Sequence, residues 1–327
     1  MGSNKQIFAG KLILVRNKFP KKMTTLKIAL DWTPNINHIG ILIAKELGMY
    51  QQYGIDLTII SPLTDNYEVT PGKKLESDLA DFVLAPFETV ISLNNKENEV
   101  DAIAVFAILQ EDISSIASLQ STALANPKAL DGKTYASYKA RYEDKIVKEL
   151  VINDGGEGIF KIVYPDKLGI WNTLLDGTAD ATWIFNNWEG IEAESKNIAL
   201  NKWSLNDYAI PYGYSPVIIT KRKNLKNNLA LYSNFIKATR NGYLFATENK
   251  SVSIEILRSY LTAYDKENMN LEKALDATIT YFGDHNNCGR MNQERVDTFL
   301  NWLVENNLEK PKIKNQQLFT NELLNLI

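Results

Sequence analysis

Short apolar runs of strand type alternate with amphipathic helical stretches along the first two-thirds of the chain. In the first part the strand-type runs are residues 26–30, 55–60, 81–84 and 102–109, and a helical pattern covers residues 41–48. The run at 102–109 is the longest and predicts a fully buried strand. Because strands that alternate with helices form parallel sheets with right-handed crossovers, the pattern predicts an α/β fold with a mostly parallel sheet.

A second unit of the same type begins near Pro127. Its predicted strands are residues 134–137, 159–163 and 179–184, and its predicted helices lie around residues 146–151 and 168–175. Residues 176–180 repeat the character of residues 77–81, since each segment ends a helix and leads into a short strand. Both strands would end at a cleft between the two units.

After a strand at residues 217–220 the pattern is helical to the end of the chain. The predicted helices are residues 229–248, 252–264, 271–281 and 291–306. Helices alone cannot extend the second sheet, so we expect the chain to return to the first unit. Two crossings, near residues 107–110 and 211–214, would form a two-strand hinge. The expected lobes are therefore residues 24–108 plus 213–327 for the first and residues 109–212 for the second.

Composition excludes several classes of protein. Of 327 residues, 45% are hydrophobic and 23% charged, and the net charge is −3. These values describe an ordinary globular protein without the basic field that nucleic acids attract, so we expect no nucleic-acid partner. No apolar run approaches the ~20 residues that span a bilayer, so we expect no membrane span. The single cysteine, Cys288, excludes an internal disulfide and a cysteine-rich metal site.

The first 22 residues carry six Lys or Arg and no acid, and Gly10 and Lys11 interrupt their apolar part. No small-residue cleavage site follows, so this segment does not match a secretory signal. We therefore predict a cytoplasmic protein that is not secreted. A mitochondrial leader remains an alternative, as does a simple extension ahead of Met23.

The loop at residues 31–40 carries the densest candidate chemistry. It joins a predicted strand to a predicted helix, the place where open α/β sheets bind ligands. Trp32 is either a stacking surface for a ligand or a core residue. Asn35 follows it as a candidate donor, and His38 either donates to the ligand or caps its own helix.

The order of several motifs resembles the type 2 periplasmic-binding-protein fold. The motifs are KIALDWTPNINH at residues 27–38, ELGMY at 46–50, YGIDL at 53–57, ADFVLA at 80–85 and LDGK at 130–133. They are similar to the branch shared by bacterial alkanesulfonate- and pyrimidine-precursor-binding proteins and the fungal pyrimidine synthase of thiamine biosynthesis. YKARY at 138–142 and WIFNNWE at 183–189 resemble a subgroup of uncharacterised microbial and fungal proteins. The resemblance implies two α/β lobes joined by a hinge, with a ligand cleft between them.

One departure from the fungal synthase matters most. In that enzyme a histidine supplies atoms of the product, and a lysine four residues earlier carries pyridoxal phosphate. Aligned on the strand at residues 81–84, those positions hold Glu88 and Leu84. Leucine cannot form a Schiff base, and a carboxylate cannot supply imidazole atoms. We therefore expect neither that mechanism nor a cofactor.

The resemblance places the ligand among the strand exits of both lobes. Ser137 and Arg141 lie on an exit that could bind a carboxylate, sulfonate or phosphate. Glu88 either accepts hydrogen bonds from an amino-pyrimidine-like ring or is an acidic residue in the first turn of a helix, where the helix dipole favours it. Trp183, inside its strand, is predicted to be core. The full set of candidate ligand-binding residues is Trp32, Asn35, His38, Tyr67, Pro86, Glu88, Ser137, Tyr138, Arg141, Asn186, Trp188, Glu189, Tyr212 and Tyr214.

Two functions follow from these residues. The first is binding of a small planar or anionic metabolite, similar to a thiamine-pyrimidine precursor, without catalysis. The alternative is an enzyme of pyrimidine-precursor metabolism that uses Glu88, Glu189 or His38 as acid–base groups. The chain has no G-x-S-x-G, Walker or strand-linked G-x-G-x-x-G motif and no metal-spaced histidines. We therefore predict a small-molecule partner, no catalytic residue and no metal site, and make no prediction of oligomeric state.

Overall fold

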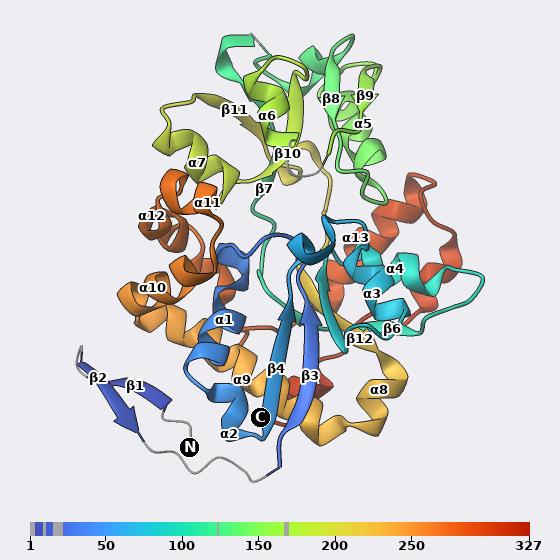
Figure 1. Cartoon of the computed structure of the whole chain (residues 1–327). Coiled ribbons are helices and arrows are strands. Elements are labelled where there is room, and N and C mark those ends of the chain that lie inside the picture. The colour runs from blue at the N-terminus through green and yellow to red at the C-terminus, as the bar shows by residue number, and fades with distance from the viewer. Residues whose placement is uncertain (1–3, 9–10, 16–21, 123, 167–169) are drawn as a thin grey trace.

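The chain folds into two α/β lobes, one above the other in Figure 1, and the polypeptide crosses between them twice. The computed structural model describes residues 4–8, 11–15, 22–122, 124–166 and 170–327. Each lobe is built on a five-stranded sheet. The prediction of a two-lobed α/β fold is confirmed.

The first sheet has the strand order β4-β3-β5-β12-β6. The bounds are β3 Thr24–Ala29, β4 Ile55–Ile60, β5 Phe82–Ala85, β6 Ala102–Ala107 and β12 Val217–Lys221. β3 pairs in parallel with β4 and β5, whereas β12 runs antiparallel between β5 and β6. β5, β6 and β12 are buried along their whole length, which explains their unbroken apolar runs.

The second sheet has the order β11-β7-β10-β8-β9. The bounds are β7 Ser114–Leu119, β8 Thr134–Ala136, β9 Lys161–Val163, β10 Ala181–Phe185 and β11 Leu200–Trp203. β7 is antiparallel to both of its neighbours, β10 and β11. In each sheet four of the five strands run in one direction and a single strand, β12 or β7, runs against them, so the prediction of a mostly parallel sheet is confirmed. β7 and β12 each follow a crossing between the lobes. They run antiparallel to the strands that helices connect.

Most helices belong to the first lobe. Its helices are α1 Ile39–Glu46, α2 Met49–Gln52, α3 Pro71–Glu76, α4 Glu88–Asn94, α8 Arg222–Asn227, α9 Leu229–Glu248, α10 Lys250–Tyr260, α11 Ala263–Asn268, α12 Leu271–Asp276, α13 Gln293–Glu305 and α14 Glu322–Asn325. The second lobe has α5 Glu143–Asn153, α6 Ile170–Leu175 and α7 Glu189–Ser195. Near the N-terminus, β1 Asn4–Phe8 and β2 Lys11–Val15 form an antiparallel hairpin.

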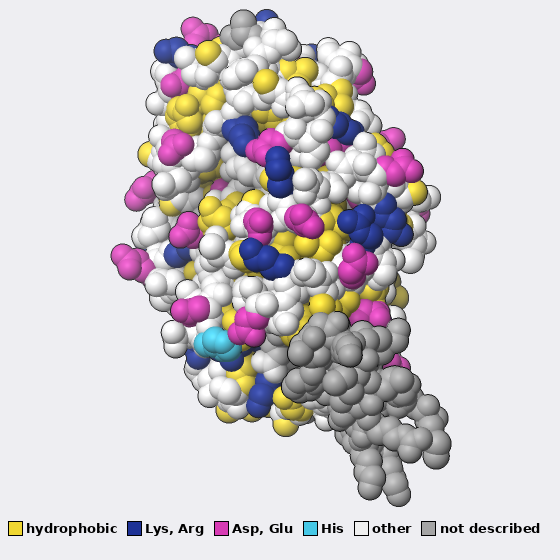
Figure 2. Space-filling model, turned by 90° about the vertical axis from the view of Figure 1, so that its left-hand side faces the viewer, with side chains coloured by type: hydrophobic (Ala, Val, Ile, Leu, Met, Phe, Trp, Pro, Cys, Tyr) yellow, Lys and Arg dark blue, Asp and Glu magenta, His cyan; other side chains and the backbone are white. Residues whose placement is uncertain are grey.

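The C-terminal helices return to the first lobe, and α9 has the predicted bounds. The helix predicted at residues 252–264 is instead divided into α10 and α11, because Thr262 caps α11 by accepting from the Asp265 N–H. None of the described helices is long and apolar enough to span a membrane. On the face shown in Figure 2, acidic and basic side chains are interspersed, without a large patch of one sign.

α1 and α9 pack at close range because glycines face each other across the contact. A methyl group on Gly242 of α9 would overlap the carbonyl of Gly40 in α1, and one on Gly40 would overlap the ring of Tyr243. The Tyr243 hydroxyl donates to the carbonyl of Asn37 at 2.7 Å. The long helix therefore fixes the loop that follows β3.

The two crossings lie side by side between the lobes. The first follows β6 and the second precedes β12, and the N–H of Ile108 donates to the carbonyl of Pro216 at 3.1 Å. In the second crossing, the carbonyl of Tyr214 accepts from the N–H of Phe87 at 2.9 Å. These bonds join the hinge to the loop after β5, which forms part of the cavity wall.

Candidate functional site

A cavity of about 460 Å³ lies between the lobes at the carboxyl ends of β3, β5, β8 and β10. The first lobe lines it with Asp31, Trp32, Asn35, Asn37, Thr70, Pro71, Gly72, Lys73, Ala85, Pro86, Glu88, Thr89, Ser92, Leu93 and Lys96. The second lobe and the second crossing line it with Tyr138, Lys139, Ala140, Arg141, Glu143, Ile146, Trp183, Phe185, Trp188, Glu189, Tyr212 and Ser215. Strand exits from two sheets thus converge on one cavity.

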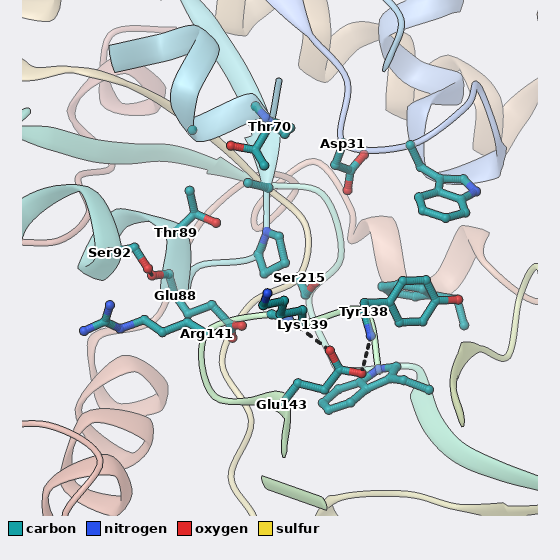
Figure 3. A pocket seen from close by; sticks show the side chains of 18 of the residues that line it. Asp31, Thr70, Glu88, Thr89, Ser92, Tyr138, Lys139, Arg141, Glu143 and Ser215 are labelled. Atoms are coloured by element: carbon teal, nitrogen blue, oxygen red, sulfur yellow. Dashed lines mark hydrogen bonds between the residues drawn. The ribbon is translucent and has the colours of Figure 1, made fainter. Parts of the chain in front are cut away.

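Aromatic side chains from both lobes meet at one end of this cavity. The ring centroids of Trp32 and Tyr138, which come from different lobes, are 5.8 Å apart. Trp183 lies 5.2 Å from Tyr212 between ring centroids. Figure 3 shows Tyr138 at this end and Thr70, Thr89 and Ser92 at the other. The cavity therefore has an aromatic end and a hydroxyl-bearing end.

Two carboxyl groups in the cavity have strongly raised pKa values. Glu88 is buried, and burial raises its pKa to about 7, although the Tyr212 hydroxyl donates to it at 3.0 Å. Burial likewise raises the pKa of Glu189 to about 7, although the N–H of Phe185 donates to its carboxylate at 3.0 Å and so lowers the pKa. Near neutral pH each group can accept a hydrogen bond or donate one.

These raised pKa values predict that the empty protein is less stable above pH 7 than near pH 5. Between pH 4.5 and about 7 the folded protein retains protons on Glu88 and Glu189 that the unfolded chain releases, so stability falls as the pH rises. For Glu88 the loss is at most about 3 kcal/mol. Glu88→Gln should flatten the dependence in denaturant unfolding at several pH values. The exposed Glu99→Gln should not, and equal slopes for Glu88→Gln and wild type would refute the assignment.

The loop after β3 is fixed by a reciprocal cap. The side chain of Asn35 accepts from the N–H of Asn37, and Nδ1 of His38 accepts from the N–H of Asn35 at 3.1 Å. Since Nδ1 is an acceptor, Nε2 carries the proton and donates to Asp31 at 2.8 Å. His38 is fully buried. Of its two predicted roles, the structure shows the cap.

Most polar groups of the turn at residues 137–142 make contacts with other groups of the protein. The hydroxyl of Ser137 donates to Asp144 at 2.6 Å and accepts from the N–H of Lys139 at 3.0 Å. Arg141 lines the cavity, but its guanidinium is bonded to Glu309. The ammonium of Lys139 lies 5.4 Å from the ring centroid of Tyr164.

Nine of the predicted residues line the cavity, namely Trp32, Asn35, Pro86, Glu88, Tyr138, Arg141, Trp188, Glu189 and Tyr212. Five lie outside its lining, namely His38, Tyr67, Ser137, Asn186 and Tyr214.

Tyr67 stands behind Trp32 at 5.0 Å between centroids and accepts from the N–H of Thr33. Asn186 donates to the hydroxyl of Ser115 on the neighbouring strand. The hydroxyl of Tyr214 accepts from the N–H of Asn292, which binds it to the first lobe. Of these three side chains, Tyr67 supports the cavity wall from behind, through its contact with Trp32.

Sequence reasoning missed part of the lining. Trp183 was expected in the core, yet it lines the cavity together with Phe185, two residues along β10. The alternation of side chains along a strand was the signal, because residues two apart share a face. Lys73 and Lys96 also line the cavity, and both pair with Glu76, at 3.1 and 2.7 Å. No pattern linked these distant residues beforehand.

A buried amide joins the lobes beside the cavity. The side chain of Asn187 donates to Asn37 at 2.8 Å and to the hydroxyl of Thr278 at 3.1 Å. Within the described part of the chain, no group of three or more His, Cys, Asp or Glu residues could hold a metal ion. The described chemistry of the cavity is thus aromatic rings, carboxyls and hydroxyls, with cations at its polar end.

Comparison with known proteins assigns the family. Residues 35–251 match the family model described as NMT1/THI5 like. The chain belongs to the NMT1/THI5-like family. This confirms the resemblance seen in the motifs, and the match includes the end of the loop after β3, the second lobe and all of α9.

Individual relatives of this NMT1/THI5-like chain are distant. It is 22% identical over 308 residues to a formylaminopyrimidine-binding protein of Halalkalibacterium halodurans, covering 89% of this chain and 88% of the relative. The alkanesulfonate-binding protein SsuA of Xanthomonas axonopodis pv. citri, solved with MOPS, has a TM-score of 0.66 at 11% identity, with 88% of this chain and 95% of that chain covered. The periplasmic nitrate-binding protein NrtA of Synechocystis PCC 6803 has a TM-score of 0.70 at 11% identity, with 93% and 88% covered. The periplasmic-binding-protein fold is confirmed.

These neighbours also correct the predicted location of this NMT1/THI5-like protein. A cytoplasmic protein that is not secreted was expected from the first 22 residues, and that prediction is wrong because the proteins that share the fold include a periplasmic binding protein. Much of that segment, residues 1–3, 9–10 and 16–21, lies outside the described residues. The basic character of the first 22 residues is therefore a poor guide to location here.

Proposed function

We propose that the chain binds a small planar heteroaromatic molecule with N–H donors, a pyrimidine of the thiamine-precursor type, in the cavity between its lobes. The observation that carries the proposal is the combination of aromatic walls with the carboxyls of Glu88 and Glu189, whose pKa values lie at about 7. A flat ring can pack against the aromatic side chains that the two lobes bring together, while its amino groups donate to carboxyl oxygens. A relative whose name states that it binds formylaminopyrimidine supports this ligand class.

The cavity favours such a ring over the anionic ligand that the turn at 137–142 suggested. Arg141 is already paired with Glu309, and four carboxyl-bearing residues lie in the cavity wall. Those four are Asp31, Glu88, Glu143 and Glu189. The wall also carries Lys73 and Lys96, which are paired with Glu76, and Lys139, which lies near the ring of Tyr164. A neutral or weakly basic ring avoids the repulsion that the acidic groups would exert on an anion.

The cavity does not favour the pyridoxal-phosphate chemistry of the fungal synthase. Leu84, at the position of that enzyme's lysine, is fully buried in β5 and does not line the cavity. Glu88, at the histidine position, faces the cavity as a carboxyl. Binding without covalent chemistry is the simpler function for these residues.

The proposal predicts that formylaminopyrimidine raises the unfolding free energy of the wild-type protein. At a hundred times its dissociation constant the ligand should add about 2.7 kcal/mol. Thermal unfolding with increasing ligand measures this, and the recovered ligand should be chemically intact. Glu189→Gln should weaken binding by about tenfold or more, because an amide keeps the shape but loses the charge-assisted bond.

Glu99→Gln, an exposed change, is the matched control and should bind as the wild type does. Absence of a shift at saturating formylaminopyrimidine, with the protein folded, would contradict the proposal. A converted product in the recovered solution would instead support the enzyme alternative.

A further inference from the structure

The wall that the second lobe gives to the cavity carries the ammonium of Lys139, which lies 5.4 Å from the ring centroid of Tyr164, and three further groups suited to an anion. They are the backbone N–H groups of Tyr138 and Ala140 and the guanidinium of Arg141, all on the turn between β8 and α5. Backbone donors beside an arginine side chain bind carboxylates, sulfonates and phosphates in many proteins. A free ligand anion would be expected to occupy them.

The chain's own carboxylates already occupy all three groups. The Glu143 carboxylate accepts from the N–H of Tyr138 and from the N–H of Ala140, both at 3.0 Å. Figure 3 shows Glu143 turned toward the backbone of this turn. Oε1 of Glu309 accepts from Nε of Arg141 at 3.1 Å and also from Nη2. Each of these three groups therefore has an internal partner before any ligand enters.

Glu309 reaches Arg141 from the opposite lobe. It follows α13, and its side chain is only 8% exposed. Besides the guanidinium, its carboxylate accepts from the hydroxyl of Tyr142 at 2.6 Å and from the side-chain amide of Asn95 at 3.0 Å. These donors hold the Glu309 carboxylate in place. Its negative charge, which comes from the first lobe, neutralises the positive charge of Arg141 in the second lobe.

We propose that Glu309 and Glu143 are specificity-determining residues, which fill the anion-binding positions of the cavity and restrict it to neutral or cationic ligands. The inference rests on the proposed function, because it takes the same cavity as the ligand site. An entering anion must displace a buried carboxylate or lie beside it, and like charges repel strongly where water is excluded. Three lysines among the described residues lie in the wall. Lys73 and Lys96 share the carboxylate of Glu76, and the ammonium of Lys139 lies near the ring of Tyr164, which reduces the pull of all three on an anion.

The test is the change Glu309→Gln, which keeps the shape and a hydrogen-bond acceptor but removes the charge. Calorimetric titration with ethanesulfonate and with inorganic phosphate, at constant ionic strength, should give at least tenfold tighter binding than in the wild type. Glu305→Gln, an exposed change at the end of the same helix, removes the same formal charge without touching Arg141 and should match the wild type. The double variant Arg141→Ala, Glu309→Gln should lose the gain.

Equal anion affinity in Glu309→Gln and wild type would overturn the inference, as would a gain that persists in the double variant. If Glu309→Gln does not fold, Glu143→Gln serves instead, because its carboxylate covers the N–H groups of Tyr138 and Ala140. Formylaminopyrimidine is titrated separately into the wild type. Its failure to bind would overturn the proposed function, whereas the anion comparison would still decide the roles of Glu309 and Glu143.

Discussion

Replacing Trp32 with alanine is expected to weaken the binding of formylaminopyrimidine by roughly 5- to 150-fold. Stacking of a base on an aromatic side chain contributes about 1–3 kcal/mol, and Trp32 supplies the first lobe's aromatic surface in the cavity. Its ring rests on Tyr67 at 5.0 Å between centroids, so it is held in position before the ligand arrives. Calorimetric titration of the variant measures the loss.

The matched control for Trp32 is Trp32→Phe, which retains an aromatic face and should keep most of the affinity. Circular dichroism should show both variants folded, since Trp32 lies on a loop at the cavity rather than in a strand. Wild-type affinity in a folded Trp32→Ala variant would show that the ring of the ligand lies elsewhere.

Replacing Gly242 with alanine is expected to lower the free energy of unfolding by about 3 kcal/mol or more. The added methyl group meets the backbone carbonyl of Gly40, which cannot rotate away as a side chain could. α1 and α9 must then separate, which loosens the Tyr243 contact with the loop after β3. Denaturant unfolding of the variant measures the effect.

Gly190→Ala is the control for this change. Gly190 also lies in a helix, α7, and no atom lies closer than 3.6 Å to its added methyl group. Its stability should stay within about 1 kcal/mol of the wild type, because alanine is the better helix former. Equal stability of the Gly242 and Gly190 variants would show that the close approach of α1 and α9 is not required.

The sequence pattern predicts most elements of the fold, but not that β7 and β12 run against the other strands of their sheets. Apolar runs mark β4 and α9 at their observed bounds, because both bury a continuous face or stripe. β7, by contrast, contains three serines among its six residues, and its pattern does not reveal a strand although it is almost wholly buried. The strand directions depend on where the chain crosses between the lobes, and local periodicity carries no such information.

The sequence identified those residues of the candidate site that directly follow a predicted strand. Glu88 and Glu189 were identified because each follows a predicted strand, and both line the cavity. The partner of Arg141 could not be identified, because Glu309 lies 168 residues away along the chain. The role of His38 could not be decided from the sequence either, because a histidine at this position could equally cap the helix or contact a ligand.

The place of β12 between β5 and β6 has a consequence for synthesis on the ribosome. The first lobe lacks its inner strand until residues 217–221 emerge, so β5 presents an unpaired edge and β6 has no strand partner while the whole second lobe is being made. The second lobe's sheet, β7 to β11, is complete earlier. We therefore expect nascent chains that end before residue 217 to require chaperone protection of their first half, even when their second half has folded.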